Sequence, residues 1–417
     1  MTKRVTGLAS RDELRRWWTR FLERSGAAAR AWAKGVRGEY HGLTYARVTR
    51  RLAREVFLNP RRRLALYVLV VASWSVFIVW GRILVPLATT PYFRPAPGFQ
   101  VIGFFENPAG GLFVDSLPAL GTWSGILDAV APFWYAIGPD GALTGDGFRE
   151  EVMGLARARG LRVMPLVNNL KTGEGNSLDA VRDPEARRRA VQGLADLVVA
   201  RDFDGLCLSF ELLPPEGRDD FTRLVQELSR ALRARGRTLS VLVFPDVELP
   251  PSVSGAFDYR AIGEAADFVI LRAFDRHWTL TPPGPISPLG WVEASIDSLL
   301  RHVPARKVIL DIGTHAYDWP LDPAAGLVEY LPTYAALERA VSAGAEIRLD
   351  EASGQSYFDY RGAGGVQRRV WVQDARHLAE RATLARRKGL RGVGVWRLGF
   401  SEDEALEELA RALGRRP

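Results

Sequence analysis

From residue 99 onward, short apolar segments alternate with longer amphipathic ones. Eight apolar segments have the length and continuous hydrophobicity of buried strands, at residues 100–105, 129–137, 162–167, 205–210, 239–244, 268–273, 308–312 and 392–398. Amphipathic patterns between them predict helices, for example at 147–159, 184–200, 219–235 and 291–302. Asp183 followed by Pro184 is a typical helix start, because the Asp caps the helix and the Pro fits its first turn. This alternation predicts an α/β fold of the (β/α)8 TIM barrel type.

A doubly wound open sheet is the alternative architecture for such an alternation. It would be supported by a Gly-rich phosphate-binding turn after the first strand, and residues 100–105 are followed by no such turn. Between the seventh and eighth apolar segments the alternation stops. A helical pattern at 332–342 is followed there by strand patterns at 346–350, 356–361 and 366–373. We therefore expect a small α+β insertion domain at about residues 325–375, with helices at 374–388 and 402–413 after it.

The amino-terminal part of the chain has a different pattern. Residues 64–80 contain no charged side chain and follow three consecutive arginines. Together with residues 81–87 they supply the roughly 20 apolar positions that a bilayer-spanning helix needs, provided that Arg82 extends toward the head groups. We expect a transmembrane helix at 64–87, a Pro-rich linker at 88–98 and the barrel at 99–417. A buried core helix is the alternative. A removable signal peptide is disfavoured because the apolar run begins far into the chain.

The distribution of charge supports this division. Residues 1–63 contain 17 Lys and Arg but 5 Asp and Glu, whereas the remaining residues contain 39 and 43. The basic segment predicts a cytoplasmic amino terminus, a single-pass anchor in the cell membrane and an extracellular barrel. Residues 10–24 can form an amphipathic helix on a membrane surface or a solvated basic tail. The mildly acidic remainder gives no reason to expect a nucleic-acid partner.

The reactive side chains bound the chemistry further. Cys207 is the single cysteine, so an intrachain disulfide and a Cys-rich metal site are excluded. The five histidines do not cluster, and we expect neither a metal nor a cofactor. In an α/β barrel the carboxyl ends of the strands face one pocket. The residues that the strand ends place there are Trp134, Tyr135, Asn168, Glu211, Asp246, Phe274, Asp275, Trp278, Tyr317 and Trp396.

Carboxylates, amides and aromatic rings together are typical of sugar sites, since rings stack on pyranose faces while polar groups bond hydroxyls. The segment from Asp204-Gly205 to Glu211 resembles the signature strand of the family 18 glycoside hydrolases, in which a Glu ends the fourth barrel strand. The resemblance covers residues 99–404. Within the family, the sequence is similar to the bacterial branch linked to spore germination and cell walls. Its other matching segments are 131–135, 165–169, 274–278, 283–291, 317–319, 370–375 and 395–399.

The resemblance implies a mechanism and also marks departures from it. Active members cleave β-linked N-acetylglucosamine polymers with retention, with the Glu as general acid and the substrate's acetamido oxygen as nucleophile. Ser209 stands where the family has an Asp that stabilises the acetamido group. Arg272-Ala273-Phe274-Asp275 replaces the pattern Met-x-Tyr-Asp, and His315 stands where relatives usually have Tyr. The resemblance therefore implies Glu211 and Asp275 as the candidate catalytic residues, and it adds Ser209 and Arg272 to the candidate substrate-binding residues at the strand ends. Groups of this kind are worth about 10²–10³ in rate each, so losing two would raise the barrier by about 5 kcal/mol or more.

Three functions remain open from the sequence. The first is a membrane-anchored glycosidase that acts on N-acetylglucosamine-containing wall or extracellular polysaccharide, with Glu211 as acid. The second is an inactive glycan-binding barrel that uses Trp134, Tyr135, Trp278 and Trp396. The third is a scaffold in envelope polysaccharide assembly. An ordinary two-carboxylate hydrolysis is also possible if Asp275 or Asp246 lies about 5–9 Å from Glu211.

Overall fold

The computed structural model describes residues 98–108, 114–169 and 181–416. The predicted transmembrane helix at 64–87, the basic segment 1–63 and most of the linker lie outside these residues. Among the described helices, none combines the length and the apolar character needed to cross a bilayer.

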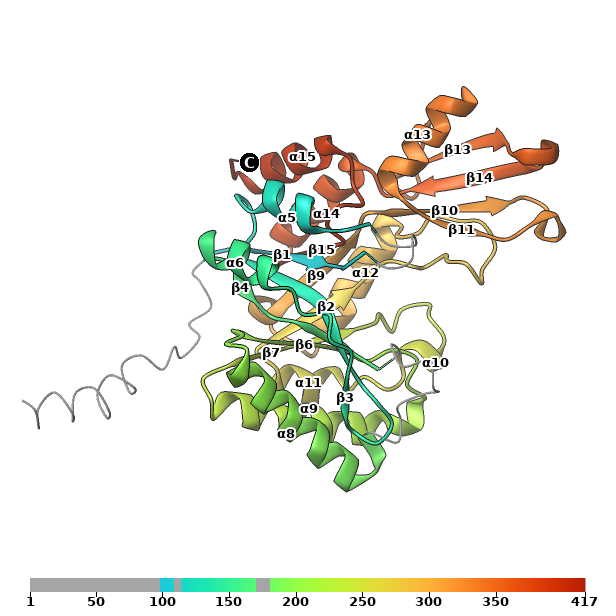
Figure 1. Ribbon diagram of the computed structural model, residues 1–417. Helices are drawn as coiled ribbons and strands as arrows, with labels where there is room; N and C mark the ends of the chain where they lie inside the picture. The colour runs from blue at the N-terminus through green and yellow to red at the C-terminus, as the bar shows by residue number, and fades with distance from the viewer. Residues whose placement is uncertain (1–97, 109–113, 170–180, 417) are drawn as a thin grey trace, which may run out of the picture. The chain divides into compact units, whose positions relative to one another are not determined.

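The core of the described chain is a closed barrel of parallel strands (Figure 1). Adjacent strands pair in parallel all the way round, and β1 closes the ring by pairing with both β2 and β15. The third position is split between two short strands, β4 and β5, which both pair with β2. The predicted barrel is therefore confirmed. The barrel strands are β1 (Gln100–Phe105), β2 (Ala129–Ile137), β4 (Arg162–Val163), β5 (Leu166–Asn168), β6 (Gly205–Ser209), β7 (Thr238–Val243), β8 (Phe268–Arg272), β9 (Val308–Gly313) and β15 (Gly392–Trp396).

Helices surround the barrel and bury their apolar faces against it. Helix α8 begins where the sequence predicts, because Asp183 accepts hydrogen bonds from the amides of Glu185 and Ala186 and Pro184 occupies the first turn. The short hairpin strand β3 (Leu143–Thr144) extends β2. The helices around the barrel are α5 (Leu117–Trp123), α6 (Glu150–Ala158), α8 (Pro184–Ala200), α9 (Arg218–Arg233), α10 (Pro251–Ser254), α11 (Tyr259–Ala265), α12 (Leu289–Leu300), α14 (Ala375–Arg387) and α15 (Asp403–Leu413).

Alternation along the barrel strands decides which side chains face the barrel axis. On β6, Leu206 and Leu208 join the outer core between barrel and helices, whereas Cys207 joins the inner cluster. Successive side chains of a strand point to opposite faces, so Ser209 faces inward as Cys207 does. Ile270 of β8 and Ile309 of β9 also belong to the inner cluster. Arg272 and Asp311 each follow them by two residues on the same strand, so their side chains also face the axis.

A second sheet is inserted between β9 and β15, where the sequence predicts an insertion. It is antiparallel and has the strand order β11-β10-β14-β13-β12, with α13 (Thr333–Ala343) packed on one face. The sheet begins earlier than the expected start near residue 325, because β10 follows β9 almost directly and pairs with β14 some 50 residues later. Its strands are β10 (His315–Pro320), β11 (Glu329–Pro332), β12 (Arg348–Asp350), β13 (Gln355–Arg361) and β14 (Gln367–Val372).

Candidate active site

Glu211 follows β6 at the carboxyl end of the barrel, and its backbone is fixed by a buried side chain. The Asn169 carboxamide donates from Nδ2 to the Glu211 carbonyl at 2.9 Å and accepts from the Glu211 amide at 2.8 Å. Asn169 is fully buried, so this double hydrogen bond fixes where the Glu211 side chain begins. The sequence interpretation chose the neighbouring Asn168, which lies on β5 opposite Ser209 and is buried. Asn169 was not chosen, because the sequence does not show which of the two adjacent Asn side chains points toward Glu211.

The carboxylate of Glu211 is paired with Arg272, the last residue of β8. Arg272 Nη1 donates to Glu211 Oε1 at 2.7 Å, and Arg272 Nη2 lies 3.6 Å from Asp275 Oδ2. The side chains of Glu211 and Asp275 are 25% and 23% exposed, so the cluster opens to solvent. Burial by itself would lower the pKa of Arg272, but the Glu211 and Asp275 carboxylates outweigh burial and raise it. Arg272 is therefore a permanent cation between two carboxylates.

Aromatic rings hold the guanidinium group in place. Its central carbon lies 4.7 Å from the ring centroid of Phe274, 5.0 Å from that of Trp396 and 5.4 Å from that of Phe244. Such cation–π contacts favour a charged group over a ring face. They also limit the positions that the guanidinium can reach, so a change of partner for Arg272 involves movement of the partner rather than of the arginine.

Asp275 is held by residues of the insertion sheet. Tyr317 donates its hydroxyl to Asp275 Oδ1 at 3.0 Å, and His315 Nε2 lies 3.0 Å from the same oxygen. Burial acts to raise the pKa of Asp275, but attraction to His315 and Arg272 and these hydrogen bonds lower it overall. Asp275 is thus a stable carboxylate, and its backbone takes a left-handed conformation with φ of 62°.

A third carboxyl group, that of Asp311 on β9, lies beside Arg272 of β8. Asp311 was not among the predicted residues. Arg272 and Asp311 are paired across the two strands, and Gly394 of β15 is the partner on the other side. A Cβ atom at Gly394 would lie 2.8 Å from Asp311 Oδ1, so the glycine leaves room for the carboxyl group. Burial raises the pKa of Asp311 well above its usual range, which favours the neutral acid. The signal in the sequence that could have identified Asp311 was an acidic residue at an inward position of a buried strand.

Three predicted binding residues lie away from this cluster. Trp134 is fully buried and Tyr135 is 4% exposed, and both pack on the outer side of β2 against Phe203. The register of β2 shifts between Phe133 and Tyr135, where these two adjacent side chains lie. Asp246 accepts a hydrogen bond from Ser298 of α12 and lines a separate concavity beside α11.

The remaining predicted residues lie at or near the cluster, but two have no surface to offer a ligand. Phe274 and Ser209 are each 1% exposed, so Phe274 supports Arg272 and His315 rather than a sugar. Tyr317 is also buried, and its hydroxyl is engaged by Asp275. Trp396 is partly exposed beside Arg272, and Trp278 is 36% exposed on the loop after β8. These two tryptophans are the available stacking surfaces.

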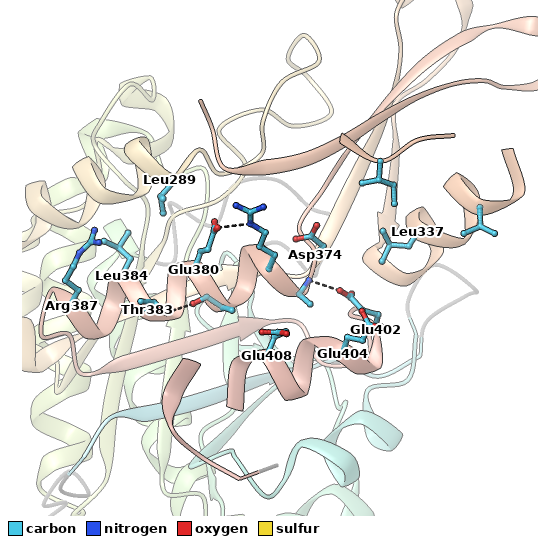
Figure 2. Close-up of a pocket in the computed structure, with 15 residues that line it drawn as sticks. Leu289, Leu337, Asp374, Glu380, Thr383, Leu384, Arg387, Glu402, Glu404 and Glu408 are labelled. Atoms are coloured by element: carbon cyan, nitrogen blue, oxygen red, sulfur yellow. Dashed lines mark hydrogen bonds and ion pairs between the residues drawn. The ribbon is translucent and has the colours of Figure 1, made fainter. Parts of the chain in front are cut away.

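A large groove elsewhere has a different composition (Figure 2). It has a volume of about 880 Å³ and lies along α14 and α15, with Leu337 of α13 on its other side. Its carboxylates include Asp374, which caps α14 by accepting from the amide of His377, and Glu402, which accepts from the amide of Ala375. None of its lining residues belongs to the Glu211 cluster, so the chemistry of the mouth and not cavity size defines the candidate site. Within the described residues, no group of three or more His, Cys, Asp or Glu side chains could hold a metal ion.

A closed parallel barrel with clustered carboxylates at its carboxyl end defines a barrel of the glycosidase type. The sequence profile of the glycosyl hydrolases family 18 matches residues 134–401, more than half of the chain. This protein belongs to the glycosyl hydrolases family 18, as the resemblance in the sequence predicted.

Individual relatives agree with this assignment. The chain is 28% identical over 225 residues to the cortical fragment-lytic enzyme of Bacillus subtilis (strain 168), a match that covers 53% of this chain and 52% of the relative. The chitinase from Chromobacterium violaceum ATCC 12472 is 27% identical with a TM-score of 0.70, covering 76% of this chain and 100% of that one. The spore cortex-lytic enzyme SleL of Bacillus cereus, at 22% identity and a TM-score of 0.69, shares the fold over 76% and 74% of the two chains. The chain spans about half to two thirds of the length of the curated relatives it matches most strongly.

Proposed function

We propose that this protein is a glycoside hydrolase that acts on N-acetylglucosamine-containing polysaccharide of the cell wall or the extracellular matrix. The observation that carries the proposal is the placement of Glu211 at the carboxyl end of β6, where it shares the guanidinium of Arg272 with Asp275. The family membership and the relatives named as chitinase and cortical fragment-lytic enzyme support this substrate class.

In this proposal Glu211 donates a proton to the glycosidic oxygen, and Asp275 remains ionised beside the reacting sugar. Glu211 and Asp275 both contact the guanidinium of Arg272, at 2.7 and 3.6 Å, so the two carboxylates that a paired mechanism needs lie beside one another at the mouth. An acetamido nucleophile would receive little help from Ser209 and Phe274, because both are buried and neither carries a charge. The paired route through Asp275 is therefore the one that the geometry favours.

The proposed location is the outer face of the cell membrane. The uncharged segment 64–87 would anchor the chain, the basic residues 1–63 would stay in the cytoplasm, and the barrel would face the wall. Wall glycan chains would be the partner and substrate, with the partly exposed Trp396 and Trp278 stacking on sugar rings.

The test compares wild type with Glu211→Gln in a fragment that starts at Pro91. Residues from Pro91 onward form one compact unit, and the chain from Chromobacterium violaceum matches over its full length, so we expect this fragment to fold by itself. Release of products from N-acetylglucosamine oligomers and from peptidoglycan should fall by about 10²–10⁴ in the variant. Glu293→Gln, which changes an exposed carboxylate paired with Lys388, is the matched control and should retain turnover. Absence of turnover by wild type on both substrates would reject the hydrolase.

A glycan-binding barrel without turnover is the second candidate, and the ion pair between Arg272 and Glu211 favours it. Arg272 donates to Glu211 Oε1 at 2.7 Å, so one of the two oxygens that could carry the acid's proton is already occupied by a charge-assisted hydrogen bond. This candidate predicts that wild type and Glu211→Gln both bind oligosaccharides and that neither cleaves them.

A further inference from the structure

The ion pair at the barrel mouth leaves Glu211 easier to displace than its neighbour Asp275. Within the described residues, the Glu211 carboxylate has Arg272 as its one side-chain hydrogen-bond donor. Asp275 has two further partners, the Tyr317 hydroxyl and His315, and it stays 3.6 Å from Arg272. Removing Glu211 from the guanidinium therefore breaks one charge-assisted hydrogen bond and leaves the Asp275 network intact.

Arg272 can accept a new anionic partner without leaving its place. Its Nε atom has no hydrogen-bond partner among the described residues, and its guanidinium is enclosed by Phe244, Phe274 and Trp396. Asp311 is the nearest other carboxyl group, and its burial favours the neutral form, so it does not neutralise the cation. The other titratable groups that face Arg272 are Tyr317 of β10 and Tyr330 of β11, which are neutral phenols with raised pKa values.

The cluster is reachable from solvent on the side of Glu211. The side chains of Glu211 and Arg272 are 25% and 11% exposed, and Trp396 stands beside the guanidinium as a partly exposed ring. A sugar ring stacked on Trp396 would bring its substituents within reach of Arg272. An arginine fork binds carboxylates with two parallel hydrogen bonds, which is the geometry that a planar carboxylate on a sugar offers.

We propose that Arg272 is the binding site for a carboxylate carried by the glycan, and that this carboxylate replaces Glu211 as the partner of the guanidinium. The displaced Glu211 carboxylate then faces solvent. This inference rests on the proposed function in one respect, since it names acidic rather than neutral glycans as the substrate class.

Calorimetric binding tests the exchange without requiring turnover. The wild-type fragment starting at Pro91 is titrated with carboxylated oligosaccharides and with a neutral N-acetylglucosamine oligomer of equal length. The acidic oligomers should bind about 10-fold or more tightly than the neutral one, because only they can pair with the guanidinium of Arg272. An oligomer with uronic acid units and one with lactyl ether carboxylates are both used, because either source supplies the same group. Equal affinity for acidic and neutral oligomers would overturn the inference.

Two variants separate the exchange from simple misfolding. Glu211→Gln removes the competing anion, so acidic oligomers should bind about 10-fold or more tightly than they bind wild type. A misfolded variant cannot gain affinity. Arg272→Gln should lose about 10–100-fold in affinity for acidic oligomers while keeping its affinity for neutral ones. Glu293→Gln serves as the control and should match wild type in its affinity for both kinds of oligomer. Weaker acidic binding by Glu211→Gln would overturn the inference.

Turnover measured on the same ligands separates this inference from the proposed function. If acidic oligomers bind more tightly than neutral ones and no oligomer is cleaved, Arg272 is a carboxylate site on a barrel that does not hydrolyse, and only the hydrolase proposal fails. If neutral oligomers are cleaved as fast as acidic ones and bind equally well, the hydrolase stands and the carboxylate site is rejected.

Discussion

Two arginine–carboxylate networks in this protein differ in how completely their polar atoms are satisfied. In the insertion sheet, Asp318 is fully buried and accepts hydrogen bonds from Arg368 Nε and the Tyr360 hydroxyl, both at 2.6 Å, and from Arg339. Arg368 also donates to the Asp318 carbonyl at 2.8 Å. At the barrel mouth, the Glu211 carboxylate has one hydrogen-bond donor among the described residues, and a quarter of its side chain is exposed.

The difference shows how structural and functional ion pairs can be told apart. The Asp318 network has a protein partner for each carboxylate oxygen, and it joins β10, β14, β13 and α13. Such a network is costly to break and has no capacity for a ligand. The mouth network leaves Arg272 Nε and both Asp311 oxygens without a hydrogen bond among the described residues. Unsatisfied buried polar atoms call for an explanation, and a ligand site is the one that fits here.

The largest effect on stability should come from breaking the saturated network. Asp318→Ala leaves the Arg368 guanidinium buried with its main partner missing, so the free energy of unfolding should fall by about 3–5 kcal/mol in urea titrations. Asp359→Ala, which removes a partly exposed partner of Arg369 in the same sheet, is the control and should cost about 1 kcal/mol or less. Equal losses in the two variants would contradict the distinction between the networks.

A smaller effect on stability but a clear effect on function is expected at Asn169. Asn169→Ala removes both hydrogen bonds that hold the Glu211 backbone, so oligomer turnover should fall by about tenfold or more as the acid loses its position. Asn168→Ala is the matched control on the preceding residue. Comparable losses of turnover in both variants would show that Asn169 has no special positioning role.

At the rim of the mouth, Trp278→Ala should weaken oligosaccharide binding by about 5–10-fold, the loss of one stacking contact. The same substitution should leave the free energy of unfolding nearly unchanged, because Trp278 is 36% exposed. Trp134→Ala provides the contrast, since Trp134 is fully buried and should lose stability without a direct effect on affinity. Affinity measured by titration and unfolding in urea separate the two cases.

The smallest effect concerns pH and Asp311. The folded-state pKa of Asp311 is raised above its unfolded value, so the native state binds more protons than the unfolded chain above about pH 4. The stability contributed by the protonated acid is present at low pH and is lost as pH rises toward the folded-state pKa. Asp311→Asn should remove this loss, and its unfolding free energy should fall less between pH 4 and 8 than that of wild type. Parallel curves for the two proteins would contradict the prediction.

Much of the fold follows from local pattern. The eight barrel strands lie where continuous apolar segments occur, and α8 begins at Pro184 because its cap and first turn are encoded by adjacent residues. The extent of the insertion sheet was not predictable in this way. Strand β10 pairs with β14 about 50 residues away, and residues 315–320 have a mixed polar and aromatic pattern that does not distinguish a strand from a loop.

The sequence by itself determined the barrel, its family and the position of Glu211 and Asp275 at the strand ends. Local hydrophobicity identifies the buried strands, and the turn residues that follow identify their carboxyl ends. Only the tertiary structure decided which side chains meet. It placed Trp134, Tyr135 and Asp246 away from the Glu211 cluster, with the two aromatic side chains in the outer core of the barrel and Asp246 bonded to Ser298 of α12. It also paired Arg272 with Glu211, residues 61 positions apart, and added Asp311 beside them. Contacts of this kind depend on strand register and side-chain direction, which a local pattern does not specify.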